Sequence, residues 1–181
     1  MEYILAAKMR CQKLYIGITN PDMLHAKASV YDENRGTKAG NPLSYRERCE
    51  LIRRAMAEFR VPESQYEIIP FPISYPEYIT QYAPKDAVYF MGIYDEWDEE
   101  KYKILRSLDL DIHVLWRKEL KEKGITGLQV RGLIATEQKW DHLVPKSVYA
   151  YLTESQLDKR IKRLELMRIE EKKIIKMEPE E

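Results

Sequence analysis

The residue types best suited to bind phosphate groups lie together near residue 126 of this chain. Thr126, Gly127 and Arg131 fall at the start of a predicted helix over 127–137. The first N–H groups of a helix have no partner inside the helix, and the helix dipole favours an anion there. A hydroxyl, an unobstructed amide and a guanidinium at this point predict a triphosphate-binding corner.

Further candidate ligand-binding residues follow predicted strands, at the edge where open α/β sheets bind their ligands. Gly17 lies near the end of one buried strand, and Gly92 ends another. Tyr94 and Trp97 come soon after Gly92, so their rings are candidates to border a base. A glycine beside a ligand allows the backbone to approach closely. For Gly17, an ordinary strand-to-loop turn is an equally good interpretation.

Two segments resemble one enzyme family. Ile-Thr-Gly-Leu-Gln-Val-Arg, over 125–131, resembles the I-S-x-T-x-x-R element of nucleotidyltransferases whose other signature is H-x-G-H. The similarity is greatest to the archaeal-type nicotinamide-nucleotide adenylyltransferases. Asn-Pro-Leu-Ser-Tyr-Arg-Glu-Arg, over 41–48, resembles the family's Asn-Pro-Phe-Thr-x-x-Glu-Arg segment. Leu128 stands where the family has threonine, so one expected hydroxyl is absent.

The resemblance implies a function for these residues. Members of the family transfer a nucleotide from ATP or CTP to a phosphate monoester and release pyrophosphate, generally with Mg²⁺ on the phosphates. They act by positioning and charge stabilisation, without a covalent intermediate. We expect transfer of AMP from ATP to nicotinamide mononucleotide or a related monoester. The acceptor and the choice between ATP and CTP stay open.

The expected site residues comprise a catalytic pair and a larger nucleotide-binding set. The catalytic pair is Thr126 and Arg131, and the nucleotide-binding set is Gly17, Asn41, Arg46, Arg48, Gly92, Tyr94, Trp97, Thr126, Gly127 and Arg131. For Arg46 and Arg48, solvated charges on a helix are the alternative interpretation. No protein metal site is expected, because His25, His113 and His142 lack the spacing of metal ligands.

The chain contains no H-x-G-H sequence. In the family this motif follows the first strand, and residues 1–4 resemble those just after its second histidine. The first strand, which occupies the middle of a sheet ordered 3-2-1-4-5, is therefore expected to be missing. Its loss should separate its two neighbours and uncover about five apolar side chains, which weakens the fold by about 10 kcal/mol.

Three explanations for the missing motif stay open. The true start of the protein lies upstream of Met1 and the parent is an active adenylyltransferase. Alternatively, the chain is a non-catalytic relative that binds nucleotide or serves as an assembly partner. In the third explanation, another subunit or the C-terminal helix covers the exposed sheet.

The order of the predicted elements favours an α/β fold with a Rossmann-like parallel sheet. Strands are predicted over 14–18, 66–71, 87–92 and 112–116, and helices over 2–10, 44–59, 96–107, 127–137 and 145–152, with a short helix from Pro76. The nucleotidyltransferase-like domain is expected over 1–152. A charged helix and an acidic tail are expected over 153–181.

The C-terminal helix has an apolar stripe at spacings of three and four residues, formed by Leu157, Ile161, Leu164 and Met167. Such a stripe docks on its own domain or pairs with a second copy, so a homo-oligomer is possible. Thirty basic and thirty acidic residues cancel, which gives no overall field toward nucleic acid or a membrane. Two distant cysteines and the absence of a long apolar run favour a soluble cytoplasmic protein.

Overall fold

The structure is a computed structural model that describes residues 1–19, 21 and 36–175. Most of the long loop expected over 22–42, including His25, therefore lies outside the described residues, as does the acidic tail. Among the described helices, none combines the length and apolar character that crossing a membrane requires.

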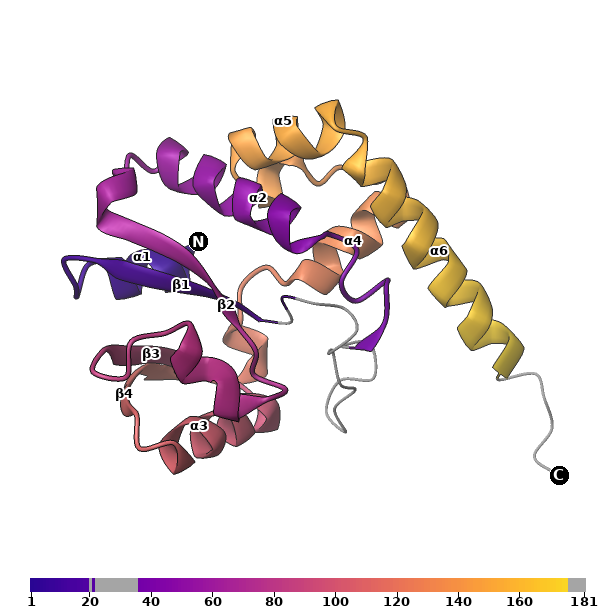
Figure 1. The fold of residues 1–181 in the computed structure, drawn as a ribbon. Helices are drawn as coiled ribbons and strands as arrows, with labels where there is room; N and C mark the ends of the chain where they lie inside the picture. The colour runs from indigo at the N-terminus through magenta and orange to yellow at the C-terminus, as the bar shows by residue number, and fades with distance from the viewer. Residues whose placement is uncertain (20, 22–35, 176–181) are drawn as a thin grey trace, which may run out of the picture.

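Within the described residues, four strands form two parallel pairs (Figure 1). β1 (Leu14–Thr19) pairs with β2 (Tyr66–Phe71), and β3 (Val88–Ile93) pairs with β4 (Asp111–Arg117). A helix lies between the members of each pair along the chain, as a parallel connection requires. The expected α/β class is confirmed.

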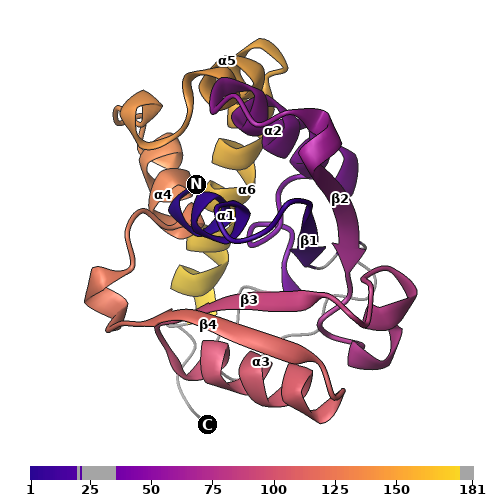
Figure 2. The same ribbon diagram turned by 90° about the vertical axis from the view of Figure 1, so that its left-hand side faces the viewer.

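The sheet is divided at one place. In the described part of the chain, β1–β2 and β3–β4 are separate two-stranded sheets. Figure 2 shows the β3–β4 pair, with α3 beneath it, apart from the β1–β2 pair. The N-terminal helix is hydrogen-bonded to β3, because the hydroxyl of Tyr3 donates to the carbonyl oxygen of Phe90.

The helices begin where the local sequence predicts. Ser44 caps α2 through a capping box, in which its side chain accepts from the Glu47 amide at 3.3 Å and the Glu47 carboxylate accepts from the Ser44 amide at 2.8 Å. The α-helices are α1 (Glu2–Lys8), α2 (Tyr45–Glu58), α3 (Glu96–Ser107), α4 (Gly127–Ala135), α5 (Lys146–Glu154) and α6 (Leu157–Ile175). Short 3-10 helices span Glu63–Gln65, Pro76–Gln81, Leu120–Glu122 and Asp141–Leu143.

Helix α6 differs from the single helix expected from Thr153. Gln156 has a φ of 55°, and this left-handed residue separates α5 from α6. Leu157 and Ile161 are buried in one core cluster with residues of α2, α4 and α5. The prediction that Met167 ends the apolar contact stripe is wrong, because Met167 is 50% exposed while Glu165 is 2% exposed. The contact surface of α6 is therefore rotated toward Glu165, which pairs with Arg168.

Gly17 has a packing role in the β1–β2 pair. A Cβ atom at Gly17 would lie 2.9 Å from Cβ of Phe71, closer than such atoms approach in proteins.

We expect Gly17→Ala to lower the free energy of unfolding by about 1–3 kcal/mol through overpacking, measured by urea denaturation. Gly132→Ala is the matched control, because among the described residues its added methyl group would meet no atom within 4 Å beyond its chain neighbours and the backbone of its own helix. The Gly132→Ala change should instead stabilise α4 by about 0.5–1 kcal/mol. Equal stability of Gly17→Ala and wild type would contradict the packing role of Gly17.

Candidate functional site

A cavity of about 800 Å³ lies where the N-terminus, α2, the end of β3 and the start of α4 meet. Its apolar wall includes Leu51, Ala55 and Met91, and its polar wall includes Asp98 and Lys123. Four of the expected site residues line it, namely Gly92, Tyr94, Thr126 and Gly127. The cavity therefore joins the end of β3 to the predicted phosphate corner.

The predicted phosphate corner lies at the first turn of α4. Thr126 caps this helix, because its Oγ1 accepts from the Gln129 amide at 3.2 Å and its amide donates to Gln129 Oε1 at 2.8 Å. Nη1 of Arg131 lies 3.1 Å from the position that a Cβ of Gly127 would occupy. The Arg131 guanidinium thus packs beside the helix N-terminus, over the glycine. A guanidinium beside the N-terminus of a helix is an arrangement that attracts phosphate oxygens.

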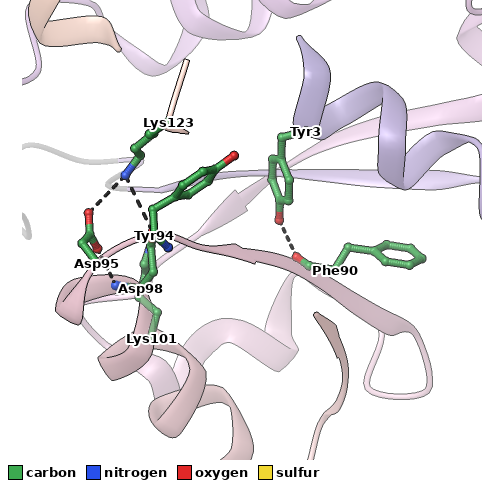
Figure 3. A network of polar contacts seen from close by, with 7 residues as sticks. All are labelled: Tyr3, Phe90, Tyr94, Asp95, Asp98, Lys101 and Lys123. Atoms are coloured by element: carbon green, nitrogen blue, oxygen red, sulfur yellow. Dashed lines mark hydrogen bonds and ion pairs between the residues drawn. The ribbon is translucent and has the colours of Figure 1, made fainter. Parts of the chain in front are cut away.

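A polar network fixes the segment that leads into this corner (Figure 3). Nζ of Lys123 lies 3.1 Å from Oδ2 of Asp95 and 3.7 Å from Oδ2 of Asp98. Asp98 is 5% exposed, accepts from the Tyr94 amide at 3.1 Å and pairs with Lys101 at 2.5 Å. Lys123 therefore joins the chain before α4 to the end of β3 and the start of α3. The network sets the position of the phosphate corner relative to β3.

Asp95 makes the network sensitive to acid. Burial alone would raise the pKa of Asp95, but the Asp98 amide and the Lys123 ammonium lower this pKa below its ordinary value. The unfolded chain therefore binds a proton on Asp95 at higher pH than the folded protein does. The stabilisation is complete above the unfolded pKa of about 3.9 and is lost as the pH falls through the lower folded value.

We expect Asp95→Asn to be less stable than wild type at neutral pH and to approach wild-type stability in acid, once the pH has fallen through the lowered pKa of folded Asp95. The reason is that protonated Asp95 no longer attracts Lys123, so the two side chains become nearly equivalent in acid. Urea denaturation at both pH values measures the difference. Asp111→Asn, at an exposed position of β4, is the control. A stability difference that stays constant between the two pH values would contradict this assignment.

Six of the expected site residues, Arg131 among them, lie outside the lining of this cavity, within the described part of the chain. Nη1 of Arg48 donates to the carbonyl oxygen of Thr19 at 2.7 Å, so Arg48 holds the end of β1 to α2. Arg46 is exposed on α2. Trp97 lies on α3, with Nζ of Lys101 5.7 Å from its ring. Gly17 packs against Phe71. The backbone N–H of Asn41 donates to the carbonyl oxygen of Thr37 at 3.1 Å.

Several residues of the cavity were not expected from the sequence. Tyr3, Asp98, Lys101, Trp116 and Lys123 all line it. The lysines stand among other charged residues in the sequence, and nothing in their spacing marks them. Trp116 is placed by an irregularity in strand pairing, which an apolar run over 112–116 does not reveal.

The fold and the cavity define an α/β protein with a candidate nucleotide site, and comparisons with known proteins give its family. No family model matches the chain. It is 39% identical over 162 residues to phosphonoformate cytidylyltransferase from Streptomyces viridochromogenes, an alignment that covers 90% of this chain and 87% of that protein. The chain therefore belongs to the nucleotidyltransferase family that includes this cytidylyltransferase.

More distant relatives agree with the resemblance found in the sequence. The chain is 27% identical over 132 residues to nicotinamide-nucleotide adenylyltransferase from Thermococcus sibiricus, covering 68% of this chain and 66% of that protein. It is 28% identical over 132 residues to the enzyme of the same name from Saccharolobus solfataricus, covering 68% of this chain and 71% of that protein. The expected relation to archaeal adenylyltransferases is confirmed.

Proposed function

We propose that this protein transfers CMP from CTP to a small phosphonate, with release of pyrophosphate. The observation that carries the proposal is the 39% identity to a phosphonoformate cytidylyltransferase along 90% of the chain. The base and acceptor thus differ from the AMP transfer to nicotinamide mononucleotide expected from the sequence. The cavity at the start of α4 supports the proposal, because it joins a phosphate corner to a space for the rest of the nucleotide.

The α4 corner holds the leaving group in this proposal. A phosphonate oxygen of the acceptor attacks the α-phosphorus of CTP, and the bond from that phosphorus to the oxygen bridging to the β-phosphate breaks. Negative charge then collects on the departing pyrophosphate. The first-turn amides of α4 and the Arg131 guanidinium stabilise this charge because they are held at the helix N-terminus before the reaction starts. Thr126 acts as the cap that orients those amides.

Mg²⁺ enters the site with the triphosphate in this proposal. Among the residues that the structure describes, no group of three or more His, Cys, Asp and Glu side chains is arranged to hold a metal. Asp98, which lines the cavity, and Asp95 are both engaged by Lys123. Bound to the phosphates, the ion would neutralise part of their charge, and the side chains of the corner would orient the remaining oxygens.

Two other functions are supported by particular observations. Adenylyl transfer to nicotinamide mononucleotide is supported by the archaeal relatives at 27% and 28% identity. Nucleotide binding without transfer, including a role in assembly, is supported by the lack of an H-x-G-H sequence in the chain. The three functions differ in base, acceptor and product.

A pyrophosphate-release assay separates these functions. CTP and ATP are each tested with Mg²⁺ and with phosphonoformate, nicotinamide mononucleotide or no acceptor. Our proposal predicts release only when CTP and phosphonoformate are both present. Release with ATP and nicotinamide mononucleotide would favour the adenylyltransferase. Nucleotide binding by calorimetry without release in any combination would favour the non-catalytic protein.

A further inference from the structure

A β-bulge places a tryptophan in the wall of the cavity. Along the β3–β4 pair, Met91 lies opposite Val114, but the next residue, Gly92, lies opposite Trp116. Leu115 is therefore the extra residue of a bulge on β4. Bulges bend a strand and redirect its side chains, and they are common next to active sites. This bulge brings Trp116 level with Gly92, at the end of β3 that lines the cavity.

Gly92 provides the space that the indole ring occupies. A Cβ atom at Gly92 would lie 2.6 Å from Nε1 and 2.9 Å from Cε2 of Trp116. Any side chain at this position would displace the ring. Nε1 is buried, and it has no hydrogen-bond partner among the described residues. The ring is thus held by shape and by the missing side chain of Gly92, and an indole N–H bond does not fix it.

The rings of Tyr3 and Tyr94 both lie beside the ring of Trp116. We term these three residues the aromatic wall. The Trp116 ring centroid lies 6.2 Å from that of Tyr3 and 6.2 Å from that of Tyr94, with interplanar angles of 78° and 66°. All three residues line the cavity, which also includes the phosphate corner. One space therefore has an aromatic part and an anion-binding part, as a nucleotide requires.

We propose that Trp116 contacts the nucleobase of the bound nucleoside triphosphate and that the aromatic wall is the base subsite. This inference rests on the proposed function. Any of the nucleobases can stack on an aromatic side chain, because each has a flat π-face. A small phosphonate has no ring to stack. When the triphosphate is bound at Thr126 and Gly127, the base extends into the other part of the same cavity, where the aromatic wall lies.

Tryptophan fluorescence tests this assignment directly. The chain has three tryptophans, and Trp97 and Trp140 are not among the residues lining the cavity. CTP should quench wild-type fluorescence, and Trp116→Phe should lose most of this quenching while still binding CTP in calorimetry. Trp140→Phe, in the core cluster around α5, is the matched control and should keep the quenching. Inorganic tripolyphosphate should bind at the phosphate corner with little quenching, because it has no base.

Two further variants measure the contribution of the ring to affinity. Trp116→Ala should weaken CTP binding about tenfold or more, since it removes the stacking surface. Gly92→Ala should also reduce quenching, because its methyl group displaces the indole, and circular dichroism checks that both variants fold. Full quenching in Trp116→Phe, or unchanged affinity in folded Trp116→Ala, would overturn the base subsite alone. Absence of CTP binding by the wild-type chain would overturn the proposed function as well.

Discussion

Replacement of Arg131 by alanine should weaken CTP binding by roughly ten- to a hundredfold. The Arg131 guanidinium lies over Gly127 at the N-terminus of α4, where the helix dipole and the first-turn amides also attract an anion. A charge-assisted hydrogen bond from this group to a phosphate contributes about 1.5–3 kcal/mol, which corresponds to this loss of affinity. Calorimetric titration with CTP measures the change.

Matched variants separate charge, geometry and folding in this experiment. Arg131→Lys keeps the positive charge but loses the planar fork of donors, so its affinity should fall between those of wild type and Arg131→Ala. Arg163→Ala, on the exposed side of α6, is the control for loss of a surface arginine and should bind CTP as wild type does. Wild-type affinity in a folded Arg131→Ala variant would remove Arg131 from the phosphate corner.

Replacement of Asp98 by alanine should lower the free energy of unfolding by about 2–3 kcal/mol. Asp98 is buried, and its carboxylate serves the Tyr94 amide, Lys101 and Lys123 at once. Its removal leaves the partly buried N–H of Tyr94 without this acceptor, takes the counter-charge from Lys101 and leaves Lys123 with Asp95 alone. The partial exposure of the lysines, at 26% and 34% of their side chains, keeps the loss below that of a fully buried pair.

Urea denaturation of Asp98→Ala and Asp98→Asn measures this contribution. The asparagine keeps an oxygen that accepts from the Tyr94 amide, so it should retain roughly half of the stabilisation. Because Lys123 precedes the phosphate corner, both variants should also bind CTP more weakly than wild type. Wild-type stability in Asp98→Ala would show that the network in Figure 3 does not support the fold.

Local features of the fold were predictable from the sequence. The capping boxes of α2 and α4 follow from Ser44 with Glu47 and from Thr126 with Gln129, because each pair lies within one helical turn. The position of Arg131 beside Gly127 was predictable for the same reason, since Arg131 lies one turn after Gly127. The parallel strands follow from their apolar runs and the helices between them.

Features that depend on distant contacts were not predictable in this way. The bulge that places Trp116 depends on the register between β3 and β4, and a run of apolar residues does not specify register. Gly92 was expected beside a ligand, but in the structure the neighbour that needs its space is Trp116. Arg48 was expected at the nucleotide, but its guanidinium binds the Thr19 carbonyl after folding brings α2 to β1.

Phosphorus NMR of the reaction between CTP and phosphonoformate, with Mg²⁺ present, tests the proposed activity most directly. The account predicts that CTP disappears while pyrophosphate and a cytidylylated phosphonate appear in equal amounts, and that Arg131→Ala slows both together. Each product reports one side of the bond exchange at the α-phosphorus. Unchanged CTP, or CTP consumed without a new phosphonate signal, would contradict cytidylyl transfer to a phosphonate.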